Sequence, residues 1–202
     1  MRIAIVDNGI GNLGNLENYV LRTMDSRPEI VKEIGKAGHY DLVILPGVGN
    51  FSALSEKLSI LRGELEEHLR AGGYVLAICL GMEILFEESE ESSGKGLGMF
   101  RGRVVKIPTS SGLRIPRIGW SRLEIIRRTQ PWEMLDGSWH YYAHSYYAST
   151  SEDAVIGVSR YGSLVIPSLL VKGGIVATQF HPERSGASGD LFANALKSYV
   201  RR

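Results

Sequence analysis

Residues 74–83 read YVLAICLGME and place a continuous apolar run directly before a stretch with helical spacing. An apolar run of this kind is typical of a strand buried on both faces, which is how strands lie in a parallel sheet. Two earlier segments repeat the order, because the strand-like runs 3–6 and 42–45 each precede a helical pattern, at 13–24 and 54–69. The repetition predicts an α/β fold in which helices cover both faces of a largely parallel sheet.

The second half of the chain shows a different pattern, in which short apolar segments follow one another with only turns between them. This pattern predicts antiparallel strands, so we expect a mixed sheet in a three-layer arrangement, with one domain over residues 1–202. The acidic run EESEE at 87–91 is interpreted as a solvated helix end. The expected strands are 104–107, 121–126, 140–148, 154–161, 164–171 and 175–180, and a closing helix is expected at 189–200.

The composition is that of an ordinary globular protein and argues against several classes of function. Hydrophobic residues make up 44% of the 202 residues and charged residues 22%,. A formal net charge of +1 gives no general attraction to nucleic acids or anionic membranes,. No apolar run approaches the roughly 20 residues of a membrane span. The N-terminal sequence lacks the features of a secretory signal and a single cysteine cannot form an internal disulfide, so we expect a cytoplasmic protein.

Cofactor and metal signatures are not found in the sequence. Residues 7–14 contain three glycines, but their spacing is not that of a dinucleotide-binding loop,. The histidines and the single cysteine show no metal-ligand spacing. We therefore expect neither a cofactor nor a metal ion.

Cys79 is the first residue that could carry chemistry. It stands where a buried strand gives way to a helix, and ligands collect at the carboxyl ends of parallel strands,. Ala77 and Gly81, two residues away on either side, are small enough for the sharp turn of a nucleophile elbow. Free N–H groups at the start of the following helix would favour a thiolate. The local pattern leaves two interpretations open, a nucleophile and a cysteine that is simply part of the core.

His181 and Glu183 supply a possible base and its orienting group. Residues two apart in an extended segment point to the same side, so the carboxylate can hold the imidazole,. Pro182 stiffens the pair because it fixes its own backbone angle and biases the residue before it toward an extended conformation. Taken alone, a surface His–Glu pair is the simpler interpretation. Beside Cys79, the three residues match the logic of nucleophile, base and orienter.

A third segment, 45–51, reads LPGVGNF and follows another buried strand. Its glycines allow close approach of the backbone to a ligand or reorientation of a peptide. Exposed backbone N–H groups there could stabilise an oxyanion. Most Pro-Gly pairs are only turns, so the segment by itself is a weak signal.

Together these motifs resemble the class I, triad-type glutamine amidotransferases and, more narrowly, the glutaminase subunit of imidazole glycerol phosphate synthase. They span nearly the whole chain in the family's order, and LPGVGNF is the most specific of them. The matching segments are DNGIGNL at 7–13, LPGVGNF at 45–51, AICLGME at 77–83, GKGLGMFRGRVVKIP at 94–108, IPRIGW at 115–120, HYYAHSYY at 140–147 and QFHPERSG at 179–186.

The resemblance implies a flavodoxin-like fold and a role for each matching residue. Cys79 would attack the carboxamide of glutamine, His181 would transfer the proton to departing ammonia, and Glu183 would orient His181. The ammonia would pass to a (β/α)8-barrel cyclase that forms a heterodimer with this chain and makes imidazole glycerol phosphate and aminoimidazole carboxamide ribotide. The remaining implied residues are Val48, Leu80, Gly47 and Gly49 for the oxyanion hole, Gly81, Glu83, His144, Ser145 and Tyr146 for the substrate pocket, and Asn12, Trp120, Tyr141 and Arg184 for the subunit interface.

The chain departs from the family pattern at four positions. The family usually has Gly where this chain has Ala77, Gln where it has Glu83, His where it has Arg117 and Tyr where it has Asn8. A carboxylate at Glu83, one helical turn past Cys79, could repel the substrate carboxylate, disfavour the thiolate, or turn outward without effect. We expect reduced or retuned glutaminase activity.

Two other readings remain open on the sequence. A different cysteine hydrolase could use a similar sheet, and a non-enzymatic partner could have kept the fold and lost the reaction. The His-Pro-Glu spacing and the PGVG loop argue against the first. The presence of Cys79, His181 and Glu183 argues against the second.

Overall fold

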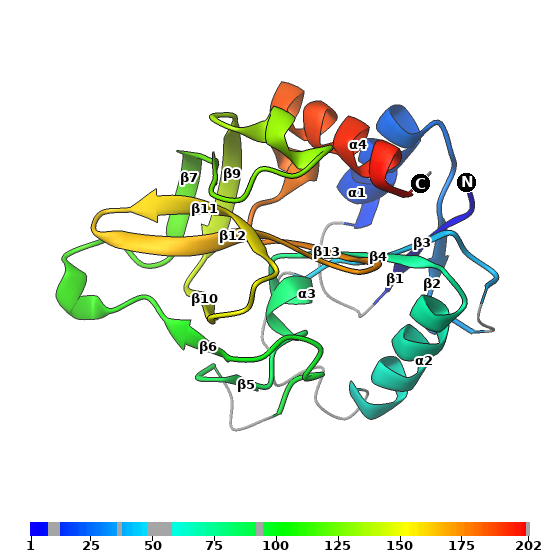
Figure 1. Cartoon of the computed structure of the whole chain (residues 1–202), viewed down its shortest axis with the longest axis horizontal. Coiled ribbons are helices and arrows are strands. Elements are labelled where there is room, and N and C mark those ends of the chain that lie inside the picture. Colours follow the sequence, from blue (N-terminus) through cyan, green and yellow to red (C-terminus); the bar gives the residue numbers. More distant parts are fainter. Residues whose placement is uncertain (8–12, 36–37, 48–57, 92–94, 201–202) are drawn as a thin grey trace.

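A mixed sheet runs through the middle of the protein with helices on both faces (Figure 1). The structure, a computed structural model, describes residues 1–7, 13–35, 38–47, 58–91 and 95–200. Within these residues the main sheet has the strand order β2-β1-β3-β4-β13-β12-β11-β8. Its strands are β1 (Ile3–Val6), β2 (Glu29–Val31), β3 (Leu42–Leu45), β4 (Tyr74–Ile78), β8 (Glu124–Ile125), β11 (Val155–Tyr161), β12 (Leu164–Lys172) and β13 (Ile175–Thr178).

The two halves of the sheet differ in direction for a reason visible in the sequence. Strands β2, β1, β3, β4 and β13 pair in parallel. Strands β12, β11 and β8 continue the sheet in antiparallel pairs. Tight turns at Gly162 and Gly173, with φ of 58° and 57°, join β11 to β12 and β12 to β13,. The expected α/β fold with a mixed, largely parallel sheet is confirmed.

Helices cover the sheet from both sides and enclose two hydrophobic cores. On one face α1 (Leu13–Met24) and α4 (Gly186–Val200) pack with the 3-10 helix η3 (Trp132–Leu135). On the other face lie α2 (Leu58–Arg70) and α3 (Leu80–Glu83). Because side chains alternate along a strand, β1 sends Ile3 and Ile5 to the first core and Ala4 and Val6 to the second,.

Two smaller sheets flank the main one. The first joins β5 (Glu88–Ser89), β6 (Arg103–Lys106) and β10 (Tyr146–Ser149). The second is an antiparallel pair of β7 (Arg117–Arg122) and β9 (Trp139–His144). The remaining 3-10 helices are η2 (Thr109–Ser111) and η4 (Pro182–Arg184). None of the helices among the described residues is long and apolar enough to cross a membrane.

Several expected elements differ from the observed ones. The helix expected after Cys79 is a single turn, because backbone N–H groups of residues 96–100 bond the carbonyls of residues 84–87 and pull that segment out of the helix. The acidic run at 87–91 was expected to end a helix, but it contains strand β5. The strand expected at 140–148 is interrupted at Ser145, so its two parts join different sheets. Strand β2, which is mostly exposed, was not expected.

Candidate active site

Cys79 occupies a strained turn between β4 and α3. Its φ of 53° and ψ of −110° make it one of two described non-glycine residues with positive φ. A side chain in this region is costly and persists where the surroundings hold it, which is typical of functional sites. A Cβ at Gly81 would lie 2.1 Å from the carbonyl oxygen of Leu45, so only glycine fits there. The predicted elbow geometry is therefore present.

His181 reaches Cys79 because β4 and β13 are neighbours in register. Ile78 pairs with Thr178, and the N–H of Cys79 donates to the carbonyl of Thr178 at 2.7 Å. Both strands end here, so the residues that follow them lie at the same edge of the sheet. The backbone of His181 is extended, and its N–H donates to the carbonyl of Tyr141 at 2.9 Å. The catalytic candidates are thus brought together by strand pairing.

Glu183 holds the imidazole of His181. Its Oε1 lies 2.8 Å from Nδ1 of His181, and both side chains are largely buried. A carboxylate next to Nδ1 favours a hydrogen on Nδ1, either in the neutral Nδ1–H tautomer or in the imidazolium. Nε2 lies on the other side of the ring. Within the part of the chain described, Nε2 makes no hydrogen bond of normal geometry, so it is available to the thiol proton.

The charge state of His181 is set by competing effects. Burial lowers the pKa of His181, but the Cys79 sulfur and the Glu183 carboxylate raise it more, to about 10,. The imidazolium is therefore favoured when the sulfur is a thiolate. A carboxylate-held imidazole beside a cysteine is the arrangement expected of a nucleophile and its base.

The expected oxyanion hole is occupied by the protein itself. The N–H of Leu80 donates to the carbonyl of Gly47 at 3.3 Å. A Cβ at Gly47 would lie 2.5 Å from the nitrogen of Gly81, which explains a glycine at this close approach,. Val48 and Gly49, also expected at the hole, lie outside the described residues.

A small pocket opens beside Cys79. Its volume is about 180 Å³. Drug-sized ligands take roughly 300–1,000 Å³, so this pocket suits a small metabolite. Of the expected pocket residues, Gly81 is not in the lining; it packs against Leu45 instead. The lining includes Glu83, Glu91, His144, Ser145 and Tyr146 beside Cys79 and Leu80.

Glu91 is a pocket residue that the sequence interpretation missed. It lies in the acidic run at 87–91, which was taken for a solvated helix end. Strand β5 and a turn at Ser89, whose Oγ accepts the N–H of Glu91, bring it to the pocket. The available signal was a carboxylate twelve positions after a candidate nucleophile, but nothing in the local pattern distinguished it from its acidic neighbours.

His144 is a neutral imidazole in the pocket wall. Burial lowers its pKa to about 3, helped by the nearby charge of Arg117. Its Nδ1 lies 2.7 Å from the carbonyl oxygen of Tyr146, so Nδ1 carries the hydrogen and donates it,. Nε2 is then an acceptor.

Glu83 is buried and does not turn toward solvent. It is the last residue of α3 and is 4% exposed. Its Oε1 accepts a hydrogen bond of 2.9 Å from Nε2 of Gln179. Burial raises the pKa of Glu83 to about 8, with the Gln179 hydrogen bond opposing and the charge of Glu91 adding to the shift. At neutral pH the carboxyl is therefore mostly protonated.

The expected interface residues gather on β7, β9 and η4. Trp120 pairs with Tyr141 across the two strands, and their ring centroids are 6.1 Å apart. The guanidinium of Arg184 lies 4.2 Å from the centroid of the Tyr141 ring. Trp120 is 51% exposed, and Ile118 and Trp139 are exposed in the same two strands. Asn12 lies outside the described residues.

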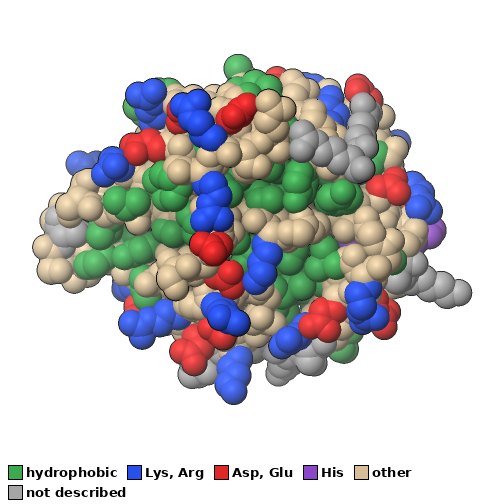
Figure 2. Space-filling model, viewed as in Figure 1, with side chains coloured by type: hydrophobic (Ala, Val, Ile, Leu, Met, Phe, Trp, Pro, Cys, Tyr) green, Lys and Arg blue, Asp and Glu red, His purple; other side chains and the backbone are tan. Residues whose placement is uncertain are grey.

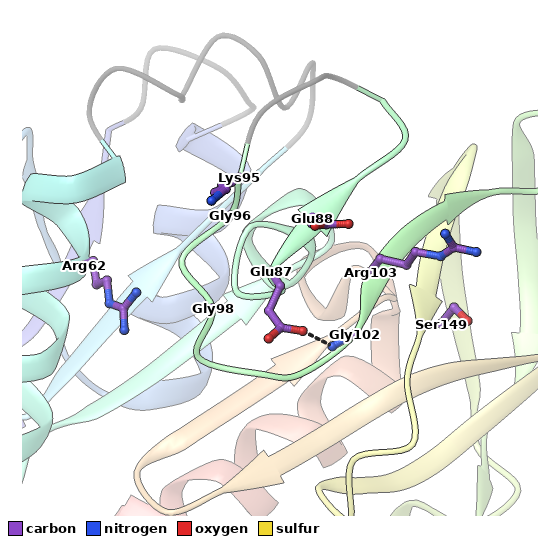
Figure 3. A pocket seen from close by; sticks show the side chains of 9 residues that line it. All are labelled: Arg62, Glu87, Glu88, Lys95, Gly96, Gly98, Gly102, Arg103 and Ser149. Atoms are coloured by element: carbon purple, nitrogen blue, oxygen red, sulfur yellow. Dashed lines mark hydrogen bonds between the residues drawn. The ribbon is translucent and has the colours of Figure 1, made fainter.

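A larger cavity lies apart from these residues, between α2 and the β5–β6 sheet (Figure 3). Its volume is about 710 Å³. Part of its lining is bonded internally, since Glu87 accepts the N–H of Gly102 and the N–H of Gly96 donates to the carbonyl of Glu87. Its described lining contains neither a cysteine nor a histidine, so the candidate catalytic residues are those beside the smaller pocket.

Comparison with known proteins agrees with this geometry. Residues 4–196 match the family described as Glutamine amidotransferase class-I. The imidazole glycerol phosphate synthase subunit HisH of Thermococcus kodakarensis is 42% identical over 193 residues, covering 93% of this chain and 94% of the relative. The HisH of Sulfolobus acidocaldarius is 41% identical over 205 residues, covering both chains in full.

Solved structures show the same fold at lower identity. The PurLQS structure from Thermotoga maritima superposes with a TM-score of 0.74 at 20% identity, covering 98% of each chain. A crystal structure of a glutamine amidotransferase gives a TM-score of 0.72 at 16% identity, covering 99% of this chain and 97% of the other. Family match, relatives and fold agree, and the chain belongs to the class I glutamine amidotransferases, within the family of HisH subunits of imidazole glycerol phosphate synthase.

Proposed function

We propose that this chain hydrolyses glutamine to glutamate and ammonia through Cys79, His181 and Glu183, and passes the ammonia to a (β/α)8-barrel cyclase in histidine biosynthesis. The cyclase would use it to make imidazole glycerol phosphate and aminoimidazole carboxamide ribotide. The observation that carries the proposal is the strained Cys79 beside the buried His181–Glu183 pair. We further propose that residues 1–202 form one domain. We also propose that the protein acts in the cytoplasm, where a reactive thiol stays reduced.

The reaction proceeds through a thioester. The Cys79 sulfur attacks the carboxamide carbon of glutamine while His181 holds the thiol proton. His181 then gives that proton to the nitrogen as the C–N bond breaks, and ammonia leaves. A water molecule, deprotonated by His181, attacks the thioester carbon, and the released thiolate regains its proton. Glu183 keeps the imidazole oriented through both halves of the reaction.

The resting site lacks a free oxyanion donor at Leu80. Its N–H already donates to the carbonyl of Gly47. The peptide after Gly47 has to turn before the N–H of Leu80 can stabilise the tetrahedral intermediate. We therefore expect slow hydrolysis by the isolated chain and faster hydrolysis in the assembled complex.

The pocket offers complementary groups for both ends of glutamine. The carboxylate of Glu91 suits the substrate ammonium, since charge-assisted hydrogen bonds are the strong ones,. The carboxamide end would face Cys79 and Leu80. The wall of β9 and β10, at His144, Ser145 and Tyr146, would enclose the middle of the molecule.

The exposed aromatic face of β7 and β9 supports a partner surface near the site. Tyr and Trp side chains are enriched at the centres of protein interfaces. On this face Trp120, Tyr141 and the guanidinium of Arg184 lie together. Tyr141 is also bridged to His181 through the backbone, so the surface adjoins the base. We assign this face to the cyclase.

The decisive experiment measures glutaminase activity with and without the cyclase and its ligand, for the wild-type chain and Cys79→Ala. We expect the cyclase to accelerate the wild type, and Cys79→Ala to lose turnover while the complex still uses added ammonia. Full glutaminase activity in Cys79→Ala would overturn the proposal.

Two further observations separate the alternatives. Hydrolysis of peptides or esters, but not of glutamine, would point to a different cysteine hydrolase. Failure of Cys79 to form an adduct with the glutamine analogue diazo-oxo-norleucine, as read by mass spectrometry, would point to a non-enzymatic partner.

A further inference from the structure

We propose that Gln179 is a positioning residue that donates an N–H to the Cys79 sulfur, and that the buried Glu83 holds its amide in the orientation this requires. The inference rests on the proposed function, in which Cys79 is the nucleophile. It assigns a role to two buried polar side chains that the reaction itself leaves unused.

The backbone places Gln179 directly beside the nucleophile. Thr178 and Ile78 are paired in the parallel ladder of β13 and β4, so Gln179 and Cys79 are the next residues of neighbouring strands. Gln179 is fully buried, and its N–H donates to the carbonyl of Ser168. The hydrogen bonds of the sheet therefore fix the backbone position from which the Gln179 side chain extends.

One amide nitrogen serves two acceptors. Nε2 of Gln179 lies 2.9 Å from Oε1 of Glu83 and 3.8 Å from Sγ of Cys79. A primary amide nitrogen carries two hydrogens, so one can go to the carboxyl and the other to the sulfur. The reversed amide would turn its oxygen toward the sulfur, which as a thiolate only accepts, so the thiolate and an accepting oxygen of Glu83 together favour the observed orientation,.

The sulfur has a different partner in each protonation state. As a thiol, Cys79 lies 3.8 Å from the carbonyl oxygen of Ala143 and can donate its S–H there. As a thiolate it only accepts, so the carbonyl contact is lost and the N–H of Gln179 becomes a favourable partner. Hydrogen bonding to the charged form favours that form. Gln179 thus stabilises the nucleophile in the state that attacks.

At pH 7, where the carboxyl is mostly protonated, Glu83 acts on the sulfur through Gln179 in this scheme. Both the protonated and the ionised carboxyl retain an oxygen that accepts from Nε2. Among the described residues, the charged or titratable groups that face it are Glu91 from the turn after β5, Tyr146 from β10, His181 from the segment after β13, and Cys79 at the start of its own helical turn. Without an acceptor at position 83, the amide loses the shorter of the two contacts that hold Nε2 toward the sulfur.

The test uses the fact that the chain has a single cysteine. Alkylation of Cys79 by iodoacetamide is followed by mass spectrometry from pH 5 to pH 9, and glutaminase kinetics are measured in the complex with the cyclase. We expect Gln179→Met to move the midpoint of alkylation upward by about one pH unit and to lower kcat about tenfold, with KM changed less than about twofold. Gln179→Asn, whose amide falls short of the sulfur, is expected to do the same.

The Glu83 variants distinguish positioning from mere packing. At pH 7, Glu83→Leu is expected to slow the alkylation of Cys79 by at least half as much as Gln179→Met does. Glu83→Gln keeps a carbonyl acceptor and is expected to restore the wild-type alkylation. The double variant Glu83→Leu/Gln179→Met should alkylate no more slowly than Gln179→Met alone. The packing control is Val176→Ala, a buried change on the same strand, which should leave the midpoint in place.

An unchanged alkylation midpoint in folded Gln179→Met or Gln179→Asn would overturn the proposal. Additive effects of the two substitutions would also overturn it, because the two residues would then act separately. Thermal melting and cyclase binding identify variants that fail to fold. Alkylation does not depend on turnover, so its outcome is distinguishable from a failure of the proposed glutaminase activity.

Discussion

At the scale of single residues, Glu83 is the departure from the family pattern with the clearest chemical effect. The structure excludes an outward-facing side chain, because Glu83 is 4% exposed and bonded to Gln179. Burial raises its pKa to about 8, so near neutral pH it resembles the neutral amide it replaces. Charge repulsion in the pocket therefore becomes important only as the pH rises.

Glutaminase rates should reveal this titration. We expect the ratio of kcat/KM between Glu83→Gln and wild type, measured in the complex, to be smallest near pH 6.5 and to rise about fivefold by pH 9,. A negative charge that costs the transition state about 1.4 kcal/mol slows the fully ionised enzyme about tenfold, and about a tenth of the carboxyl is still protonated at pH 9. A ratio that stays at one at every pH would show that Glu83 does not affect the reaction.

Two other departures are explained by local packing. Ala77 is fully buried between Leu45 of β3 and Ala177 of β13, and its methyl group is accommodated by these small and apolar neighbours. The guanidinium of Arg117 is buried with its charge 4.1 Å from the ring centroid of Tyr142 and 5.1 Å from that of Tyr161. Cation–π contact and a hydrogen bond to Ser159 offset its desolvation,.

At the scale of elements, the elbow depends on how closely α3 approaches β3. Gly81→Ala would force a methyl group against the Leu45 carbonyl, a backbone atom that cannot move cheaply. We expect a loss of about 2–4 kcal/mol in the free energy of unfolding, measured by urea denaturation. Gly63→Ala in α2 is the control, since nothing lies within 4 Å of its Cβ position. It should be neutral or stabilise by about 1 kcal/mol. Equal changes in the free energy of unfolding for Gly81→Ala and Gly63→Ala would contradict this account.

Elements with long apolar runs were predictable, and elements made by distant hydrogen bonds were not. The runs at 3–6, 42–45 and 74–78 match β1, β3 and β4 because each is buried on both faces. The helix after Cys79 ends early because residues 96–100 take its carbonyls, which no local pattern reveals.

The same limit applies to the site. Cys79, His181 and Glu183 could be proposed from spacing and strand ends. Their placement follows from the pairing of β4 with β13, and the sequence only suggested that both were strands. Glu91 and Gln179 were missed because their positions depend on β5 and on side chains meeting across strands.

At the scale of the whole molecule, stability is shared between two cores and is sensitive to acid. On the face shown in Figure 2, basic and acidic side chains are interspersed around an apolar band, and the surface ion pairs contribute little,. Buried histidines affect the sensitivity of stability to acid more than these surface ion pairs do. Burial lowers the pKa of His140 to about 4 and that of His144 to about 3.

Acid should therefore unfold the protein partly through these histidines. Below the unfolded value of 6.5 the unfolded chain binds protons that the folded chain does not,. The contribution of His140 is present above pH 6.5 and is lost as the pH falls through 4. We expect His140→Phe, which can keep the stacking on Phe180, to reduce the acid loss by on the order of 3 kcal/mol in thermal melts from pH 7 to pH 4,. His39 is exposed, so the control variant His39→Phe should retain the wild-type dependence of thermal stability on pH.

The pairing of β4 with β13 also governs when the enzyme can work. Gln179 follows Cys79 by 100 residues, and His181 comes two positions later still. A ribosome therefore releases the cysteine long before it has made the proposed base, the proposed amide donor and the strand that aligns them. Until that strand docks, the thiol of a nascent or truncated chain is an ordinary cysteine. Ammonia production is thereby confined to chains that have been translated past His181 and have docked that strand.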